Sequence, residues 1–239
     1  DRMIYATWST GYRPGGVNRR GSLPPYLSDF LTNYEAGWKT TLAGNRLRFN
    51  GAVFWEEWED FQYSFLGANG LTEIQNAGAA TIRGIESDVQ WAVSESLTLT
   101  GSMTYLYTDF SGGPGFPPAL EQLPVTPDFK ANMTARYEFD LQGLEAYVQG
   151  ALVYSSDAGI DLREAEAALI GRLPSYTLAD FSTGFDAGSF TLDFYLNNAF
   201  DDRAVLARTT ECAIGTCFGK AYDTPSQPRT FGLRFGQRF

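Results

Sequence analysis

Apolar and polar residues alternate with a period of two along most of the chain. The segment 96–110 shows this clearly, because Leu97, Leu99 and Met103 fall on one face and serine and threonine residues fill most of the other. This period predicts β-strands with one apolar and one polar face. About ten segments share the pattern, namely 2–12, 33–43, 46–66, 73–93, 96–110, 129–140, 144–155, 175–186, 189–199 and 228–239.

Most of these segments contain about 10 to 15 residues, which is close to the length that a tilted strand needs to cross a bilayer. Segments 46–66 and 73–93 are longer, and we expect them to project beyond the membrane. No run of about 18 or more apolar residues is present, so a membrane-spanning helix is excluded.

The connections between these segments alternate between short and long. Short turns lie near residues 44–45, 94–95, 141–143 and 187–188, and longer connections cover 13–32, 67–72, 111–128, 156–174 and 200–227. Antiparallel strands place successive connections at opposite ends, and outer-membrane barrels have short periplasmic turns and longer extracellular loops. The pattern therefore predicts an all-β fold, a membrane-spanning antiparallel β-barrel whose carboxy terminus is periplasmic. The alternative, a soluble β-sandwich, needs neither such long strands nor such regular connections.

Composition supports this interpretation and excludes several functions. Aromatic residues make up 15% of the chain, as expected for a barrel with two aromatic girdles. The net charge of -10 argues against a nucleic-acid partner, which requires a basic surface. The chain has no histidine, so the commonest general base and metal ligand is missing. A His-dependent mechanism, such as that of an outer-membrane protease or lipase, is therefore disfavoured. We expect no enzyme, no cofactor and no metal site, and a Ca²⁺ ion held by Glu56 and Asp60 is the alternative to the last of these.

Six stretches, in order along the chain, resemble TonB-dependent outer-membrane receptors. They are Tyr5–Asn18, Asn33–Lys39, Asn76–Glu86, Tyr176–Asp180, Leu196–Arg203 and Pro228–Leu233, followed by the terminal Phe239. The resemblance implies a barrel of about 22 strands with an amino-terminal plug in its lumen. Residues 1–239 then correspond to the carboxy-terminal part of the barrel, the last ten strands, without the plug domain and the early strands.

The resemblance also implies a function and a set of partners. The function is TonB-dependent uptake of a scarce solute, such as a ferric siderophore, cobalamin or an oligosaccharide, across the outer membrane of a Gram-negative bacterium. The partners are outer-membrane lipid and lipopolysaccharide, the remaining barrel strands and plug, TonB through the amino-terminal part, and the small-molecule ligand. The alternatives are a structural barrel fragment in a larger assembly and a self-contained barrel of ten strands.

Three groups of residues are candidates for functional roles. The candidates for ligand binding lie near the long connections and are Arg13, Asn18, Arg19, Tyr26, Trp58 and Asp60, for which contact with lipopolysaccharide or simple solvation is the alternative. The candidates for the wall that faces the lumen or the plug lie at the polar positions of the alternating pattern. They are Glu86, Asp88, Arg136, Glu138, Asp193 and Arg234. For these residues, local pairing with one another is the alternative. Phe239 is the candidate assembly signal of the closing strand.

The two cysteines, Cys212 and Cys217, lie in one Gly-containing segment of a long connection. A local disulfide is expected if the protein folds in an oxidising compartment, and two free thiols are the alternative.

Overall fold

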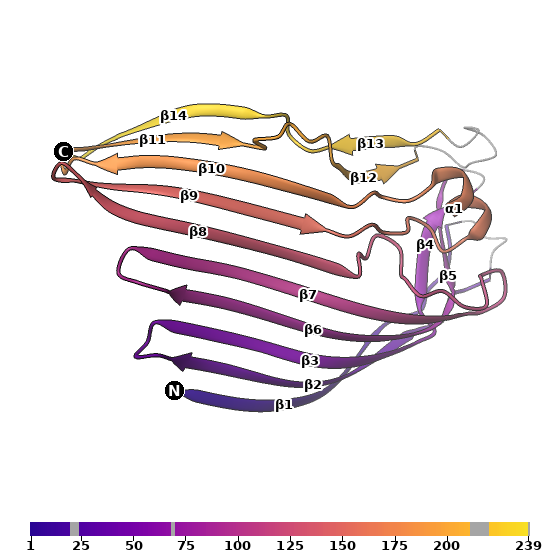
Figure 1. The fold of residues 1–239 in the computed structure, drawn as a ribbon. Coiled ribbons are helices and arrows are strands. Elements are labelled where there is room, and N and C mark those ends of the chain that lie inside the picture. Colours follow the sequence, from indigo (N-terminus) through magenta and orange to yellow (C-terminus); the bar gives the residue numbers. More distant parts are fainter. Residues whose placement is uncertain (20–23, 68–69, 211–219, 239) are drawn as a thin grey trace.

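A computed structural model describes residues 1–19, 24–67, 70–210 and 220–238. It contains one ten-stranded sheet in which all neighbouring strands are antiparallel (Figure 1). The strands, in spatial order, are β1 (Arg2–Arg13), β2 (Asp29–Leu42), β3 (Leu47–Glu59), β6 (Gly78–Ala92), β7 (Leu97–Gly112), β8 (Phe129–Leu141), β9 (Leu144–Ser155), β10 (Tyr176–Asp186), β11 (Phe190–Asn197) and β14 (Thr230–Gln237). Within the described residues, β1 and β14 have one sheet neighbour each. The predicted ten-strand, all-β fold is confirmed.

The short turns all lie at one end of the sheet, which we call the turn end, and the long connections lie at the other, the loop end (Figure 1). The turn between β8 and β9 shows why a short connection suffices there. Gln142 and Gly143 both have positive φ, 57° and 86°, and two such residues give a hairpin turn whose twist matches that of the strands. Both chain ends lie at the turn end (Figure 1), where Thr41 N–H donates a hydrogen bond to the carbonyl of Asp1 at 2.8 Å.

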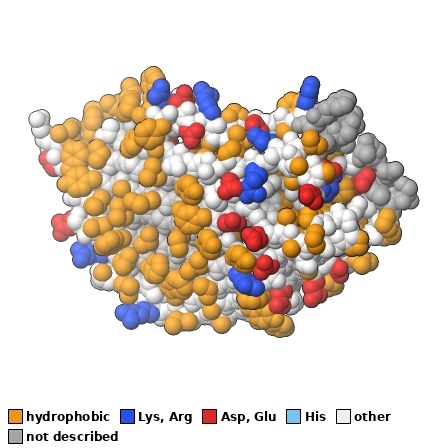
Figure 2. Space-filling view, turned by 45° about the vertical axis from the view of Figure 1, so that its right-hand side comes forward, with side chains coloured by type: hydrophobic (Ala, Val, Ile, Leu, Met, Phe, Trp, Pro, Cys, Tyr) orange, Lys and Arg blue, Asp and Glu red, His pale blue; other side chains and the backbone are white. Residues whose placement is uncertain are grey.

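The two faces of the sheet differ as the alternation predicts. Side chains of directly paired residues share a face, so the register carries the apolar face from strand to strand, as in Trp8 opposite Tyr34 and Tyr34 opposite Trp55. Figure 2 shows hydrophobic side chains gathered over the turn half of the molecule and charged side chains collected toward the loop end. The apolar face includes the exposed residues Ile4, Trp8, Tyr34, Val53, Trp55, Met103, Tyr105, Met133, Val148, Leu152, Phe181, Phe194, Leu233 and Phe235.

Two predicted strands, 46–66 and 73–93, are each broken in the structure, which corrects the expectation of continuous projecting strands. The breaks lie at Asp60, with φ of 51°, and at Gly78, with φ of 134°. Beyond them, β4 (Gln62–Leu66) and β5 (Thr72–Asn76) form a separate two-stranded sheet. A Cβ at Gly78 would come within 2.1 Å of the Ser111 carbonyl oxygen, so only glycine fits where the backbone turns.

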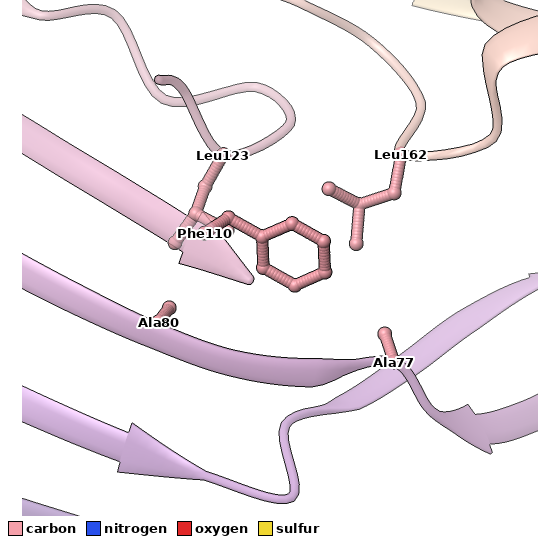
Figure 3. Packing of buried hydrophobic residues seen from close by; sticks show 5 residues of the cluster. All are labelled: Ala77, Ala80, Phe110, Leu123 and Leu162. Carbon is pink, nitrogen blue, oxygen red and sulfur yellow. The ribbon is translucent and has the colours of Figure 1, made fainter. Parts of the chain in front are cut away.

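The connections at the loop end pack against one another around a small hydrophobic core. Its buried members come from three connections and two strands and are Ala77, Ala80, Phe110, Leu123 and Leu162 (Figure 3). Leu162 precedes α1 (Glu164–Ile170), a short helix within this connection. A second two-stranded sheet, β12 (Val205–Thr209) with β13 (Tyr222–Pro225), was not predicted. In the described part of the chain, no helix has the length and hydropathy needed to cross a membrane.

Candidate functional site

The loop ends of β1, β2 and β3 meet at a buried carboxylate. The Asp29 side chain is only 2% exposed and accepts hydrogen bonds from Arg13 Nε at 2.9 Å and from Trp58 Nε1 at 2.9 Å. It also accepts one from the Gln62 backbone N–H at 3.2 Å. The guanidinium of Arg13 lies 5.2 Å from the centroid of the Trp58 ring. Asp29, which the sequence did not single out, therefore brings together two of the predicted ligand-binding residues, Arg13 and Trp58.

Side-chain amides join the connection between β1 and β2 to the β4–β5 hairpin. Asn18 is buried, and its amide both accepts from the Ile74 N–H at 2.8 Å and donates to the Ile74 carbonyl at 2.9 Å. Gln62 Nε2 donates to the carbonyls of Pro14 and Leu27. The Asn76 amide donates at 2.6 Å to the carbonyl of Asp60. Asn18 and Asp60 thus help to hold the connections in place, Asn18 by its side chain and Asp60 by its backbone.

Tyr26 and Arg19 lie in the same connection but have different surroundings. Tyr26 forms a backbone bridge with Gly16, with both N–H···O distances 2.9 Å. A Cβ at Gly16 would come within 2.6 Å of the Tyr26 hydroxyl, and one at Gly15 within 2.5 Å of its carbonyl oxygen. The pair Gly15-Gly16 therefore permits this close return of the chain. Arg19 is exposed.

Four aromatic side chains form a continuous series that we call the aromatic row, namely Trp58, Phe61, Tyr63 and Phe65. The centroids of successive rings are 4.5, 6.4 and 5.9 Å apart. Arg13 lies over the first ring, and the Arg163 guanidinium lies 4.4 Å from the centroid of the last. Burial raises the pKa of the Tyr63 hydroxyl, which therefore stays neutral at physiological pH. Both guanidinium groups are already ion-paired, Arg13 with Asp29 and Arg163 with Asp161 and Glu166. The row therefore offers a ligand chiefly aromatic surface, which suits a ligand with organic rings.

The six residues predicted to face the lumen all lie on the polar face and form two groups. Glu86 and Asp88 lie on β6, where Asn50 donates to Asp88 at 3.1 Å. The other four line β8, β11 and β14. Arg136 donates to Glu138 at 2.8 Å and lies 3.6 Å from the Tyr147 ring centroid. The Tyr147 hydroxyl donates to Asp193 at 2.8 Å, and Arg234 is the register partner of Asp193.

Both groups border hollows in the polar face. An open hollow of about 580 Å³ near the turn end is lined by Arg136, Glu138, Tyr147 and Asp193, together with further carboxylates. A second, of about 590 Å³, is lined by Glu86 and Asp88. Within the described residues, no group of three or more acidic, cysteine or histidine side chains is arranged to hold a metal ion. Cys212, Cys217 and Phe239 lie outside the described residues, so the disulfide and the assembly signal stay predictions.

Polar contacts also fix the later connections to one another. Arg172 donates to Gln122 at 2.6 Å and to Asp157 at 2.7 Å, joining the connections 113–128 and 156–175. Arg208 of β12 donates to the carbonyl of Ile170 at the end of α1 at 2.9 Å and to Asp223 of β13 at 2.8 Å. The described parts of the loop end therefore form one connected layer.

The Arg208–Asp223 pair makes part of this layer sensitive to acid. The hydrogen bond from Arg208 holds the pKa of the Asp223 carboxyl below its usual value. A carboxyl with a depressed pKa stabilises the fold above its unfolded pKa of about 3.9, and this contribution is lost as the pH falls through the folded value. We expect the amides of β12 to exchange faster below that pH, when each exchange rate is divided by the intrinsic rate of an unfolded chain at the same pH. In Asp223→Asn the extra acid sensitivity should disappear; its persistence would show that the pair is not responsible.

The model of the family described as "TonB dependent receptor-like, beta-barrel" matches residues 1–199. The chain belongs to this family. Among solved structures, the sheet superposes on the ferric yersiniabactin uptake receptor FyuA from Yersinia pestis with a TM-score of 0.77 and 19% identity, covering 98% of this chain and 34% of that one. For the siderophore receptor PiuA from Acinetobacter baumannii the TM-score is 0.72 at 18% identity, with 98% and 33% covered. For the copper transporter OprC it is 0.68 at 15% identity, with 100% and 37% covered.

These matches confirm the resemblance noted in the sequence and the all-β fold. The chain is a segment of a TonB-dependent receptor barrel that spans about a third of the length of the receptors it matches. The family consists of outer-membrane receptors of Gram-negative bacteria, which are transporters and not enzymes.

Proposed function

We propose that residues 1–239 form the carboxy-terminal part of the barrel of a receptor that imports a ferric siderophore in a TonB-dependent manner. The observation that carries the proposal is the aromatic row with Arg13 and Arg163 at its ends. Rings of the row contact the organic part of such a chelate by stacking. Of the three receptors compared above, FyuA is named for the uptake of ferric yersiniabactin, PiuA for a siderophore and OprC for copper. Cobalamin and oligosaccharides are the competing solutes.

The edges of the sheet support the proposal that further barrel strands adjoin this chain. Ile4 on β1 is 87% exposed, and Leu233 on β14 is 69% exposed. Both strands also present backbone groups on their outer edges, and in a bilayer such groups need partners within the protein. Additional strands on both edges satisfy them and complete a barrel of about 22 strands, the size of large plugged outer-membrane transporters.

The polar face supports the proposal that a plug domain fills the lumen. Carboxylates outnumber cations around the turn-end hollow, with Glu138 and Asp193 beside Arg136. A plug surface that carries basic residues complements this wall. The segment that binds TonB belongs to the same amino-terminal part of the receptor, which couples uptake to the energy source.

The orientation of the sheet is testable by labelling. We expect the loop end to be extracellular, because outer-membrane barrels have long external loops and short periplasmic turns. In a cysteine-free background, Ser64→Cys on β4 should react with a membrane-impermeant maleimide on intact cells. Glu95→Cys in the turn between β6 and β7 should react only after the cells are lysed. The reverse pattern would contradict the orientation.

The aromatic row makes a specific prediction for uptake. Removing the Phe65 ring deletes one stacking surface beside Arg163, so Phe65→Ala should raise the half-saturating concentration for siderophore uptake about threefold to tenfold. Phe200→Ala is the control, because Phe200 is 76% exposed and lies in another connection. Equal uptake by both variants would remove the row from the ligand site.

The function itself is tested by transport of radiolabelled iron under iron limitation. Deleting the gene should abolish uptake of one ferric siderophore, and an uncoupler should stop that uptake in wild-type cells. Uptake of every tested siderophore at wild-type rates in the deletion strain would refute the proposed solute class.

A further inference from the structure

Arg83 is a cation on the outward face of the sheet, at the border between the apolar side chains of the turn half and the polar side chains of the loop end. The register places it between Trp55 on β3 and Tyr107 on β7. Its guanidinium lies 4.1 Å from the centroid of the Trp55 ring and 5.9 Å from that of Tyr107. The two rings therefore hold the guanidinium in place from both sides.

The neighbouring positions on the same face mark the border of the apolar band. One step toward the turn end, the outward residues are Val53, Ile85 and Tyr105. One step toward the loop end, they are polar, and they include Glu57 and Asp109. Aromatic residues at such a border lie at the level of the lipid headgroups. Arg83 therefore lies where the hydrocarbon of one leaflet meets its headgroups.

The hydrogen-bonding groups of Arg83 are not satisfied within the described part of the chain. Its ion-pair contact there is with Asp109, at 3.6 Å between nitrogen and oxygen, which is too long for a charge-assisted hydrogen bond. By contrast, Arg136 and Arg172 approach their carboxylates to 2.8 and 2.7 Å. A guanidinium has five N–H donors, and the Arg83 side chain is 44% exposed. At the edge of the hydrocarbon, donors without partners are costly.

We propose that Arg83, held between Trp55 and Tyr107, binds a phosphate group of lipopolysaccharide in the outer leaflet. A phosphate monoester supplies several acceptor oxygens in the geometry that a guanidinium fork binds. The acyl chains of the same molecule then lie along the apolar face beside Val53 and Ile85. The assignment rests on the proposed orientation, which places the loop end, and with it Arg83, in the outer leaflet.

The Asp109 carboxylate competes with the phosphate for the Arg83 guanidinium, and its negative charge repels the phosphate. Its carboxylate is 52% exposed at the side chain, and the Tyr107 hydroxyl contacts it at 3.5 Å. Removing this charge frees Arg83 for the lipid, so Asp109→Asn should strengthen binding. If Arg83 served only to pair with Asp109, Asp109→Asn would not strengthen lipid binding.

The test is native mass spectrometry of the protein extracted from outer membranes, titrated with bisphosphorylated lipid A. Arg83→Gln should lower lipid A affinity about tenfold, the size of one charge-assisted contact, and Asp109→Asn should raise it. Arg203→Gln is the matched control, since Arg203 also has a long ion pair, 3.5 Å from Asp201, but lies in a connection. Dephosphorylated lipid A should bind the wild type and Arg83→Gln equally.

Two results would overturn the assignment. The first is equal lipid A binding by Arg83→Gln and Arg203→Gln, provided both variants show the same heat-modifiable migration as the wild type. The second is displacement of lipid A by inorganic phosphate, which would identify a site for a free anion. Neither readout involves siderophore uptake or labelling of loop residues on cells, so a failed uptake or orientation experiment is separable from a failed lipid site.

Discussion

Replacing Asp29 with alanine is expected to loosen the loop ends of β1, β2 and β3. The substitution leaves Arg13, the Trp58 indole N–H and the Gln62 N–H without their common acceptor. Arg13 is half-exposed and can be solvated, but the buried donors of Trp58 and Gln62 lose their acceptor, at a cost of about 1–3 kcal/mol. Amide exchange at Arg13 and Gln62 should therefore accelerate by about one to two powers of ten, as measured by hydrogen exchange in a native-like membrane.

Asp157→Ala is the matched control for this prediction. Asp157 also pairs with an arginine, Arg172, but both side chains are 55% exposed, and such exposed pairs contribute about 0–1 kcal/mol. Asp29→Asn, which keeps an acceptor oxygen but removes the charge, should fall between the two. If Asp29→Ala changed exchange no more than Asp157→Ala, the buried carboxylate would not organise the candidate site.

The second large effect is expected from Leu162→Ala in the loop core. Leu162 is 1% exposed and packs with Phe110, Ala77 and Leu123 (Figure 3). Truncating a buried leucine removes apolar burial and leaves a cavity, at a cost of about 2–5 kcal/mol. Because the core joins three connections, the loss should appear as faster proteolysis of the connection 156–175 and faster amide exchange in β4, while the sheet stays intact.

Leu169→Ala tests whether the effect expected of Leu162→Ala comes from the burial of the leucine side chain. Leu169 lies in the same connection but is 58% exposed, so its truncation should change proteolysis little. Similar proteolysis of both variants would mean that the loop core does not hold the connections together.

The strands were predictable from the sequence because each has one apolar and one polar face. A strict alternation with a period of two fits a β-strand and does not fit a helix. The same signal concealed the breaks at Asp60 and Gly78, since alternating aromatic residues continue through Phe61, Tyr63 and Phe65. The turn depends on the Ser111 carbonyl facing Gly78 across the sheet. That contact is tertiary and leaves no periodic signal.

The candidate site was only partly predictable for a similar reason. Arg13 and Trp58 stand out as a cation and a large aromatic residue near long connections. Asp29 does not, because its role comes from partners 16, 29 and 33 residues away. Asn18 looks like a ligand contact in the sequence, but its amide is occupied by the Ile74 backbone. Connections lack periodicity, so such pairings follow only from the three-dimensional arrangement.

The claim that this sheet is one part of a larger receptor barrel is tested most directly by the intact mass of the mature protein. This chain accounts for 26.4 kDa and covers about a third of the receptors that it matches. Mass spectrometry of the protein purified from the outer membrane should give a mass well above 26.4 kDa, with peptides from additional strands and a plug. A folded, heat-modifiable outer-membrane protein of 26.4 kDa would contradict the account and show that ten strands close alone.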